Sequence, residues 1–215
     1  MAARPQDKPP APRLYLVTPP VGDSERFAGE LAAALGGADI AAVLLRLEAA
    51  DERSLINRIK ALAPVVQDKG AALVLDGHPD LVARAGADGA HLTGIDAFNG
   101  ALPTLKPARI AGAGGLRTRH DAMLAAEAGA DYVMFGEPDG ERPSFAAIVE
   151  RIAWWAEVFE PPCVGYAETI DEVGQLAAAG ADFVAVGDFV WRDARSPVAG
   201  VSAAAERLFA AEALG

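Results

Sequence analysis

Cysteine is almost absent from this sequence, which holds Cys163 and no other cysteine in 215 residues. A lone cysteine cannot form a disulfide within the chain, and proteins of the reducing cytoplasm rarely carry disulfides. No basic residue neighbours Cys163 in the sequence to lower the pKa of its thiol, so we interpret it as a small core residue rather than a nucleophile. The cysteine content favours a cytoplasmic protein.

Basic residues are scarce relative to acidic ones. The chain carries 19 lysines and arginines against 30 aspartates and glutamates, which gives a formal net charge of −11. The phosphates of a nucleic acid would be repelled by such a chain unless it held a local basic stripe, and the sequence contains none. We therefore expect a small-molecule ligand and no nucleic-acid partner.

Long apolar runs are also lacking, although 52% of the residues are hydrophobic. A membrane helix needs about 18 or more consecutive apolar residues, and every run here is interrupted well before that length. No leader with charged, apolar and small-residue regions precedes the first expected strand. These absences predict no membrane association and a cytoplasmic location, and they leave a homo-oligomer open.

What the chain does contain is enough apolar material for one large core. A length of 215 residues falls within the range in which an α/β barrel forms a single domain. Residues 1–12 are rich in proline and charge, and such a segment cannot bury enough apolar surface to become ordered. We expect a flexible tail over residues 1–12 and one domain over residues 13–215.

A Gly-Ala-Asp repeat organises the chain. Its copies begin at Gly37, Gly86, Gly129 and Gly180, between 43 and 51 residues apart, and each follows an alanine-rich helical run and precedes a strand-like run. A glycine in this place can take the left-handed conformation that ends a helix. The spacing is about twice the length of one strand-plus-helix unit, so a second strand is expected within each interval.

Eight short apolar runs predict strands that are buried on both faces. They are residues 14–18, 40–46, 71–75, 89–92, 109–112, 132–135, 163–166 and 183–186. Helices are expected over 25–35, from a cap at Asp51 with an interruption at Pro64, over 79–85, 118–128 and 143–159, from a Thr169–Glu172 capping box, and over 199–214. Between the fourth and fifth strands we expect a polar segment through Asp96 and a short turn ending at Pro103.

This alternation predicts an α/β protein that forms a single-domain parallel (β/α)8 TIM barrel. An open doubly wound sheet is the alternative. It is disfavoured because Pro19-Pro20 stands where the glycine-rich phosphate turn of that fold would follow the first strand.

In such a barrel the active site lies on the loops that follow the strands. The charged and titratable residues just after the expected strands are Arg46, Glu48, Asp76, His78, Asp96, Arg117, Glu137, Asp139, Glu168, Asp188, Arg192 and Arg195. Asp76 and Asp96 follow adjacent strands and could share one Mg²⁺, or each could simply cap a helix or face water. His78 is the acid–base candidate, whereas His91 lies within a strand and is expected to be buried against a neighbour.

Three stretches carry a family resemblance. Leu14-Tyr15-Leu16-Val17-Thr18 is a first strand of the family type, Leu44-Leu45-Arg46-Leu47-Glu48 stands at a Gln-Leu-Arg-x-Lys motif, and Gly86 through Asp96 matches Gly-Ala-Asp-Gly-Val-His-Leu-Gly-Gln-x-Asp. From about residue 14 to residue 209 the chain resembles a divergent member of the thiamine phosphate synthase family, which includes the TenI-like thiazole tautomerases. The resemblance implies a (β/α)8 fold and a transferase of thiamine biosynthesis, in which the nitrogen of a thiazole phosphate displaces diphosphate from a pyrimidine with the help of Mg²⁺. It also implies that Arg46 holds the diphosphate and Asp96 the metal.

The sequence departs from the family pattern where that chemistry takes place. The glutamine and lysine of the second motif are replaced by Leu44 and Glu48, and the metal aspartate after the third strand falls on Gly77. A serine and a histidine fall on Gly115 and Arg117, a Thr-x-Thr-Lys loop is replaced by residues 137–140, twin glycines fall on Tyr166-Ala167, and a serine after Gly187 falls on Asp188. Several of these changes place a carboxylate where phosphate is expected, and carboxylates repel phosphate.

Three hypotheses follow. The first is a synthase-type transferase of weakened activity, with catalytic Arg46, His78 and Arg117, a metal held by Asp76 and Asp96, and substrate contacts from Arg46, Tyr166, Ala167, Gly187 and Asp188. The second is a non-catalytic or tautomerase-like relative that binds a small heterocyclic ligand in the barrel mouth. The third is a structural or partner-binding barrel whose mouth is closed by side chains.

Overall fold

A closed barrel of eight parallel strands forms the centre of the molecule. The computed structural model describes residues 11–138 and 142–212. Each strand pairs with the next along the chain and the eighth pairs with the first, as the sequence predicts. The strands are β1 (Arg13–Val17), β2 (Ile40–Leu45), β3 (Ala72–Asp76), β4 (Gly89–Thr93), β5 (Ile110–Gly114), β6 (Tyr132–Phe135), β7 (Cys163–Ala167) and β8 (Phe183–Val186).

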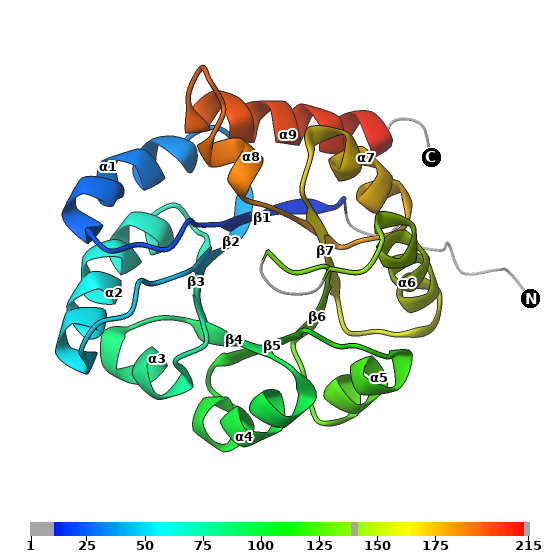
Figure 1. Ribbon diagram of the computed structural model, residues 1–215, viewed down its shortest axis with the longest axis horizontal. Helices are drawn as coiled ribbons and strands as arrows, with labels where there is room; N and C mark the ends of the chain where they lie inside the picture. The colour runs from blue at the N-terminus through cyan, green and yellow to red at the C-terminus, as the bar shows by residue number, and fades with distance from the viewer. Residues whose placement is uncertain (1–10, 139–141, 213–215) are drawn as a thin grey trace, which may run out of the picture.

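Helices surround the strands, and Figure 1 looks along the barrel they enclose. In the described residues they are α1 (Ser24–Ala34), α2 (Glu52–Gln67), α3 (Pro79–Ala85), α4 (Ile95–Leu105), α5 (Arg119–Glu127), α6 (Phe145–Val158), α7 (Ile170–Ala178), α8 (Asp188–Trp191) and α9 (Pro197–Glu212). None of the described helices is long and apolar enough to cross a membrane.

The Gly-Ala-Asp repeat marks helix-to-strand junctions, and its aspartates explain why it recurs. Gly86, Gly129 and Gly180 have positive φ angles of 81°, 100° and 97°, as expected, whereas α1 ends without a left-handed glycine at the first copy. In each later copy, the aspartate accepts a hydrogen bond from one backbone N–H near the start of the preceding strand. These contacts are Leu73 N to Asp88 at 2.7 Å, Ala111 N to Asp131 at 2.7 Å and Cys163 N to Asp182 at 2.8 Å. The repeat therefore fastens neighbouring strands at the amino end of the barrel.

Two helices correct the sequence prediction. α2 begins at the predicted cap, where Asp51 accepts from Ser54 N at 3.0 Å, but it continues through Pro64 to Gln67. Pro64 is exposed, so water can satisfy the carbonyl that loses its partner, while Leu62 and Val66 keep the buried face intact. The segment expected to be polar with a short turn is instead α4. Its buried Phe98, Ala101 and Leu105 recur at helical spacing, and Pro103 faces outward.

The apolar core has two layers. One lies between the strands and the helices, and the other fills the barrel itself. Burial raises the pKa of the Cys163 thiol to about 12, as suits an inert core residue. The inner layer also holds three aromatic hydroxyls, those of Tyr15, Tyr132 and Tyr166, which bring polar atoms into the barrel.

Candidate active site at the carboxyl end of the barrel

Arg46 and Asp76 form an ion pair at the carboxyl rim of the barrel. Arg46 follows β2 directly and Asp76 ends the neighbouring β3, so the parallel strands deliver both side chains to the same end. Arg46 Nε lies 3.6 Å from Asp76 Oδ2. The Arg46 side chain is 12% exposed and that of Asp76 is 33% exposed, so the carboxylate keeps an accessible side. The ion pair therefore holds the Arg46 guanidinium at the mouth of the barrel.

Asp96 and Glu137 lie on the same rim as Asp76, as the sequence predicts. Asp96 is exposed in the first turn of α4, after β4, and Glu137 follows β6. The described residues contain no group of three or more His, Cys, Asp or Glu side chains able to hold a metal ion. Mg²⁺ commonly uses one or two carboxylates and takes its other ligands from water and substrate phosphates. Two carboxylates on one rim, Asp76 and Asp96, are a donor set of this kind, and within the described residues they belong to no larger metal-binding group.

The other predicted catalytic residues are His78, which follows Asp76 and Gly77 in the loop after β3, and Arg117, which follows β5. His78 is exposed, has a left-handed φ of 53° and begins α3 without a side-chain cap. Arg117 lines a cavity beside β5 and β6. Arg192 pairs with Asp188 at 2.9 Å and is 79% exposed. Arg46 and Asp188, the partner of Arg192, both influence the pKa of the Tyr166 hydroxyl, whereas Arg117 lines the cavity beside β5 and β6.

In the loop after β7, a carboxylate of the protein accepts hydrogen bonds from a backbone N–H and from an arginine. Glu172 Oε2 accepts from the backbone N–H of Glu168 at 2.7 Å and from Arg142 Nη2 at 3.0 Å. Arg142 also donates to Glu168 Oε2 at 2.6 Å and to the carbonyl of Tyr166 at 3.1 Å. The expected Thr169–Glu172 capping box is wrong, since Thr169 makes no side-chain cap. The Glu172 carboxylate reaches instead to Glu168 and Arg142, two groups that could bind phosphate.

The predicted substrate residues of β7 and β8 adjoin this loop. Tyr166 and Ala167 are buried at the end of β7. Gly187 precedes α8, and a side chain added there would meet Tyr166 Oη at 3.1 Å. Burial raises the pKa of the Tyr166 hydroxyl, and the nearby carboxylate of Asp188 raises it further, while Arg46 opposes the shift. Asp188 therefore brings negative charge to the loop between β8 and α8.

A series of polar side chains in contact with one another crosses the interior of the barrel. Tyr15 Oη and Tyr132 Oη lie 2.9 Å apart, and Tyr132 Oη lies 3.0 Å from His91 Nδ1. His91 is 1% exposed, as predicted for a histidine within a strand. Its other ring nitrogen, Nε2, has no hydrogen-bond partner in the part of the chain that the structure describes, and it lies 3.5 Å from Glu137 Oε2. This series of side-chain contacts therefore ends at Glu137.

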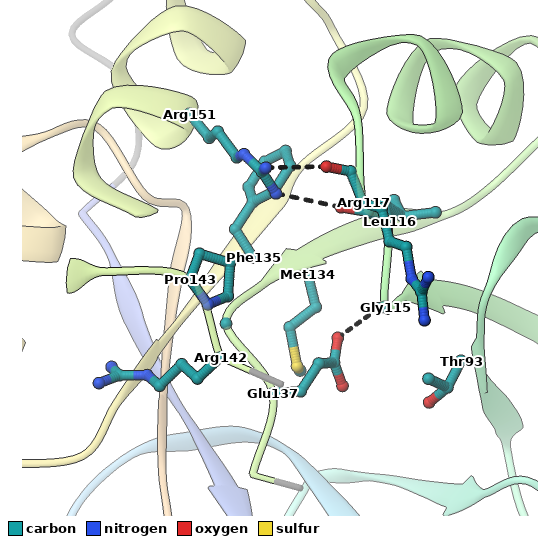
Figure 2. Close-up of a pocket in the computed structure, with 11 residues that line it drawn as sticks. Thr93, Gly115, Leu116, Arg117, Met134, Phe135, Glu137, Arg142, Pro143 and Arg151 are labelled. Atoms are coloured by element: carbon teal, nitrogen blue, oxygen red, sulfur yellow. Dashed lines mark hydrogen bonds between the residues drawn. The ribbon is translucent and has the colours of Figure 1, made fainter. Parts of the chain in front are cut away.

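Glu137 belongs to this interior series and also lines a cavity of about 460 Å³. Its Oε1 accepts from the backbone N–H of Gly115 at 2.7 Å, a contact that Figure 2 shows as a dashed line. Arg151 donates to the carbonyls of Leu116 and Arg117 at 3.1 and 2.8 Å and so fixes the adjoining loop. The sequence placed Glu137 on the rim but gave it no role, because its partners come from other strands. Asp139 lies outside the described residues.

Comparisons with known proteins agree with this geometry. Residues 14–190 match the family model described as thiamine monophosphate synthase. The thiamine-phosphate synthase of Rhodospirillum centenum is 40% identical over 200 residues, which cover 88% of this chain and 94% of that protein. The thiamine-phosphate synthase of Hyphomonas neptunium is 34% identical over 204 residues, 90% of this chain and 92% of that protein. Among solved structures, a thiamine phosphate pyrophosphorylase from Pyrococcus furiosus superposes with a TM-score of 0.75 at 22% identity, covering 93% of this chain and 96% of that one, which supports the fold.

Proposed function

The chain belongs to the thiamine monophosphate synthase family, and from that premise we propose that it joins a pyrimidine diphosphate to a thiazole phosphate in the cytoplasm, at a reduced rate. In this reaction the bond between the pyrimidine methylene carbon and the diphosphate oxygen breaks. A bond forms from that carbon to the thiazole nitrogen, and diphosphate leaves. The observation that carries the proposal is the Arg46–Asp76 pair at the rim position where the family resemblance expects diphosphate.

Each rim residue has a role in this proposal. Arg46, held in place by Asp76, binds the diphosphate and stabilises the charge that grows on it as it leaves. Asp76 and Asp96 are the carboxylates that would hold Mg²⁺, which when bound neutralises the diphosphate and improves it as a leaving group. Arg117, which lines the same cavity as Glu137, contacts the outer part of the substrate. His78 is the exposed acid–base candidate on the same rim.

The reduced rate follows from the carboxylates in the two phosphate loops. Phosphate sites of (β/α)8 barrels commonly use the loops after β7 and β8 and the start of a short extra helix. Here the first loop holds Glu172 and the second holds Asp188. Two like charges about 4 Å apart repel by roughly 4 kcal/mol at an effective dielectric near 20. Asp188 is 56% exposed and screened by water, so mostly buried Glu172 opposes a bound phosphate more strongly.

A second candidate is a tautomerase-like or non-catalytic relative that binds a small heterocyclic ligand. The cavity beside Glu137 favours it, because the Glu137 carboxylate, with buried His91 behind it, suits a ring nitrogen. This candidate needs neither Mg²⁺ nor the loops after β7 and β8.

The test is formation of thiamine phosphate from hydroxymethylpyrimidine diphosphate and thiazole phosphate with Mg²⁺ present. We expect turnover that is at least about a hundredfold slower than that of an active family member, the usual effect of losing one stabilising donor. An Arg46→Ala variant should abolish it. Turnover that equals the active enzyme contradicts the weakening, and turnover that survives in the variant removes Arg46 from the reaction.

A further inference from the structure

Glu137 presents a carboxylate that is both fixed and reachable. Its Oε1 is held by the Gly115 N–H at 2.7 Å, and its Oε2 lies 3.5 Å from His91 Nε2. The side chain is 16% exposed and lines the cavity of about 460 Å³. A carboxylate ordered in advance loses little conformational freedom when it binds a ligand, so its hydrogen bonds contribute more to affinity.

His91 is oriented from behind so that one nitrogen faces Glu137. Burial raises the pKa of the Tyr15 and Tyr132 hydroxyls, which keeps both protonated. When the Tyr132 hydroxyl donates to Nδ1, the neutral imidazole carries its proton on Nε2, toward Glu137. The buried Nε2 has no hydrogen-bond partner among the described residues, and a small shift of the Glu137 carboxylate would supply one.

Strand β5 makes the room for this arrangement. Gly112 and Gly114 stand between β4 and β6, and a β-carbon at Gly112 would collide with the Tyr132 ring and hydroxyl. A β-carbon at Gly114 would collide with both Glu137 Oε1 and His91 Nε2. The two glycines allow side chains from β4 and β6 to meet across the strand between them.

The lining of the cavity indicates the kind of ligand. Met134 and Phe135 give it an apolar part. Arg142 extends away from Glu137 in Figure 2, and it donates hydrogen bonds to Glu168, Glu172 and the carbonyl of Tyr166. Arg151 is likewise committed to backbone carbonyls. A fixed carboxylate beside apolar walls suits a flat ring that donates N–H hydrogen bonds, and Arg117, which also lines the cavity, suits an anionic substituent of that ring.

We propose that Glu137 recognises the ring of the substrate: it accepts N–H hydrogen bonds from an amino-substituted nitrogen heterocycle, and His91 is the positioning residue that holds its carboxylate. The proposal deepens the function above and rests on it for the identity of the ring as a pyrimidine. It assigns the cavity beside β5 and β6 to the heterocycle and leaves the Arg46 side of the mouth to the diphosphate.

The test measures binding of a free ring, with no diphosphate and no Mg²⁺. Calorimetry compares 4-amino-2-methylpyrimidine with 2,4-dimethylpyrimidine, in which a methyl group replaces the amine. Glu137→Gln should bind the aminopyrimidine about tenfold more weakly than the wild type, while Asp80→Asn, a rim carboxylate outside the cavity, should bind it normally. The dimethylpyrimidine should bind weakly and equally to all three proteins. Equal binding of the aminopyrimidine by the wild type and Glu137→Gln overturns the proposal, as does no binding by the wild type.

The role of His91 is tested by conservative rescue. His91→Gln keeps an N–H donor and should retain most of the aminopyrimidine affinity, whereas His91→Leu should lose it, with thermal melting used to confirm that both variants fold. Equal binding by the two folded variants removes His91 from the proposal, and if either fails to fold the Glu137→Gln comparison alone decides it. Ring binding that depends on Glu137 in a protein without transferase activity upholds this proposal and refutes the reaction. Turnover with ring binding that ignores Glu137 does the reverse.

Discussion

At the scale of single residues, Gly114 is a position at which the polar interior leaves no room for a side chain. A Gly114→Ala variant should lose about 1–3 kcal/mol of unfolding free energy, because the new methyl group would overlap Glu137 and His91. Gly29 is a matched control, since a β-carbon there meets nothing and the residue lies within α1. Gly29→Ala should gain about 0.5–1 kcal/mol. Urea unfolding of both variants measures the difference, and equal stability would show that β5 does not need its glycine.

A substitution of Asp96 tests the proposed metal site without disturbing the apolar core. It is exposed in the first turn of α4, so Asp96→Asn should fold normally. If it is a ligand of Mg²⁺, the concentration that gives half-maximal turnover should rise by about tenfold, equivalent to about 1.4 kcal/mol. A magnesium titration of the transferase rate measures this shift. An unchanged titration would assign the metal to Asp76 and the substrate alone.

The role of single residues was partly predictable. The pattern of strands placed Arg46, Asp76 and Asp96 on one rim, because chain direction fixes the end of a parallel strand at which its loop lies. It could not pair Glu172 with Arg142, which comes from the connection after another strand. Nor could it join His91 to Tyr132 and Glu137, since that contact depends on two glycines in the strand between them.

At the scale of elements, we expect the repeated aspartates to stabilise the helix-to-strand junctions. Asp88 accepts from Leu73 N at 2.7 Å and from Gln67 Nε2 at 2.9 Å, and it thereby ties α2 and β3 to the start of β4. Asp88→Ala would leave a partly buried N–H without its partner and should cost about 1–3 kcal/mol. Asp39 holds the same place in the first copy but pairs with exposed Arg13. Asp39→Ala should cost less than about 1 kcal/mol.

Denaturant unfolding of the two aspartate variants distinguishes these roles. A larger loss for Asp39→Ala than for Asp88→Ala would mean that the surface ion pair, rather than the backbone contact, holds the junction. The sequence predicted the junctions themselves because glycine, alanine and aspartate recur in one order. It missed α4 because polar residues after Gly94 resemble a loop, while the buried face is spread over three turns of helix.

At the scale of the whole molecule, eight strands and their order were predictable and the binding properties of the rim were not. Short apolar runs separated by capped helices, with no glycine-rich turn after the first, predict the closed parallel barrel that is observed. The loops of such a barrel can carry different side chains, and here the loops after β7 and β8 carry carboxylates. That difference depends on a few side chains such as Glu172 and Asp188, which alter the charge of the mouth without altering the fold.

We propose that Glu172 occupies the place of a bound phosphate in the loop after β7, and calorimetric titration with thiazole phosphate measures whether it does. The matched control is Asp171→Ala, because Asp171 lies in the same helical turn but pairs with exposed Arg207. We expect Glu172→Ala to bind thiazole phosphate at least about tenfold more tightly than the wild type, because the Glu168 N–H and Arg142 become available, and we expect Asp171→Ala to bind it as the wild type does. Tight binding by the wild type that weakens in Glu172→Ala would contradict it.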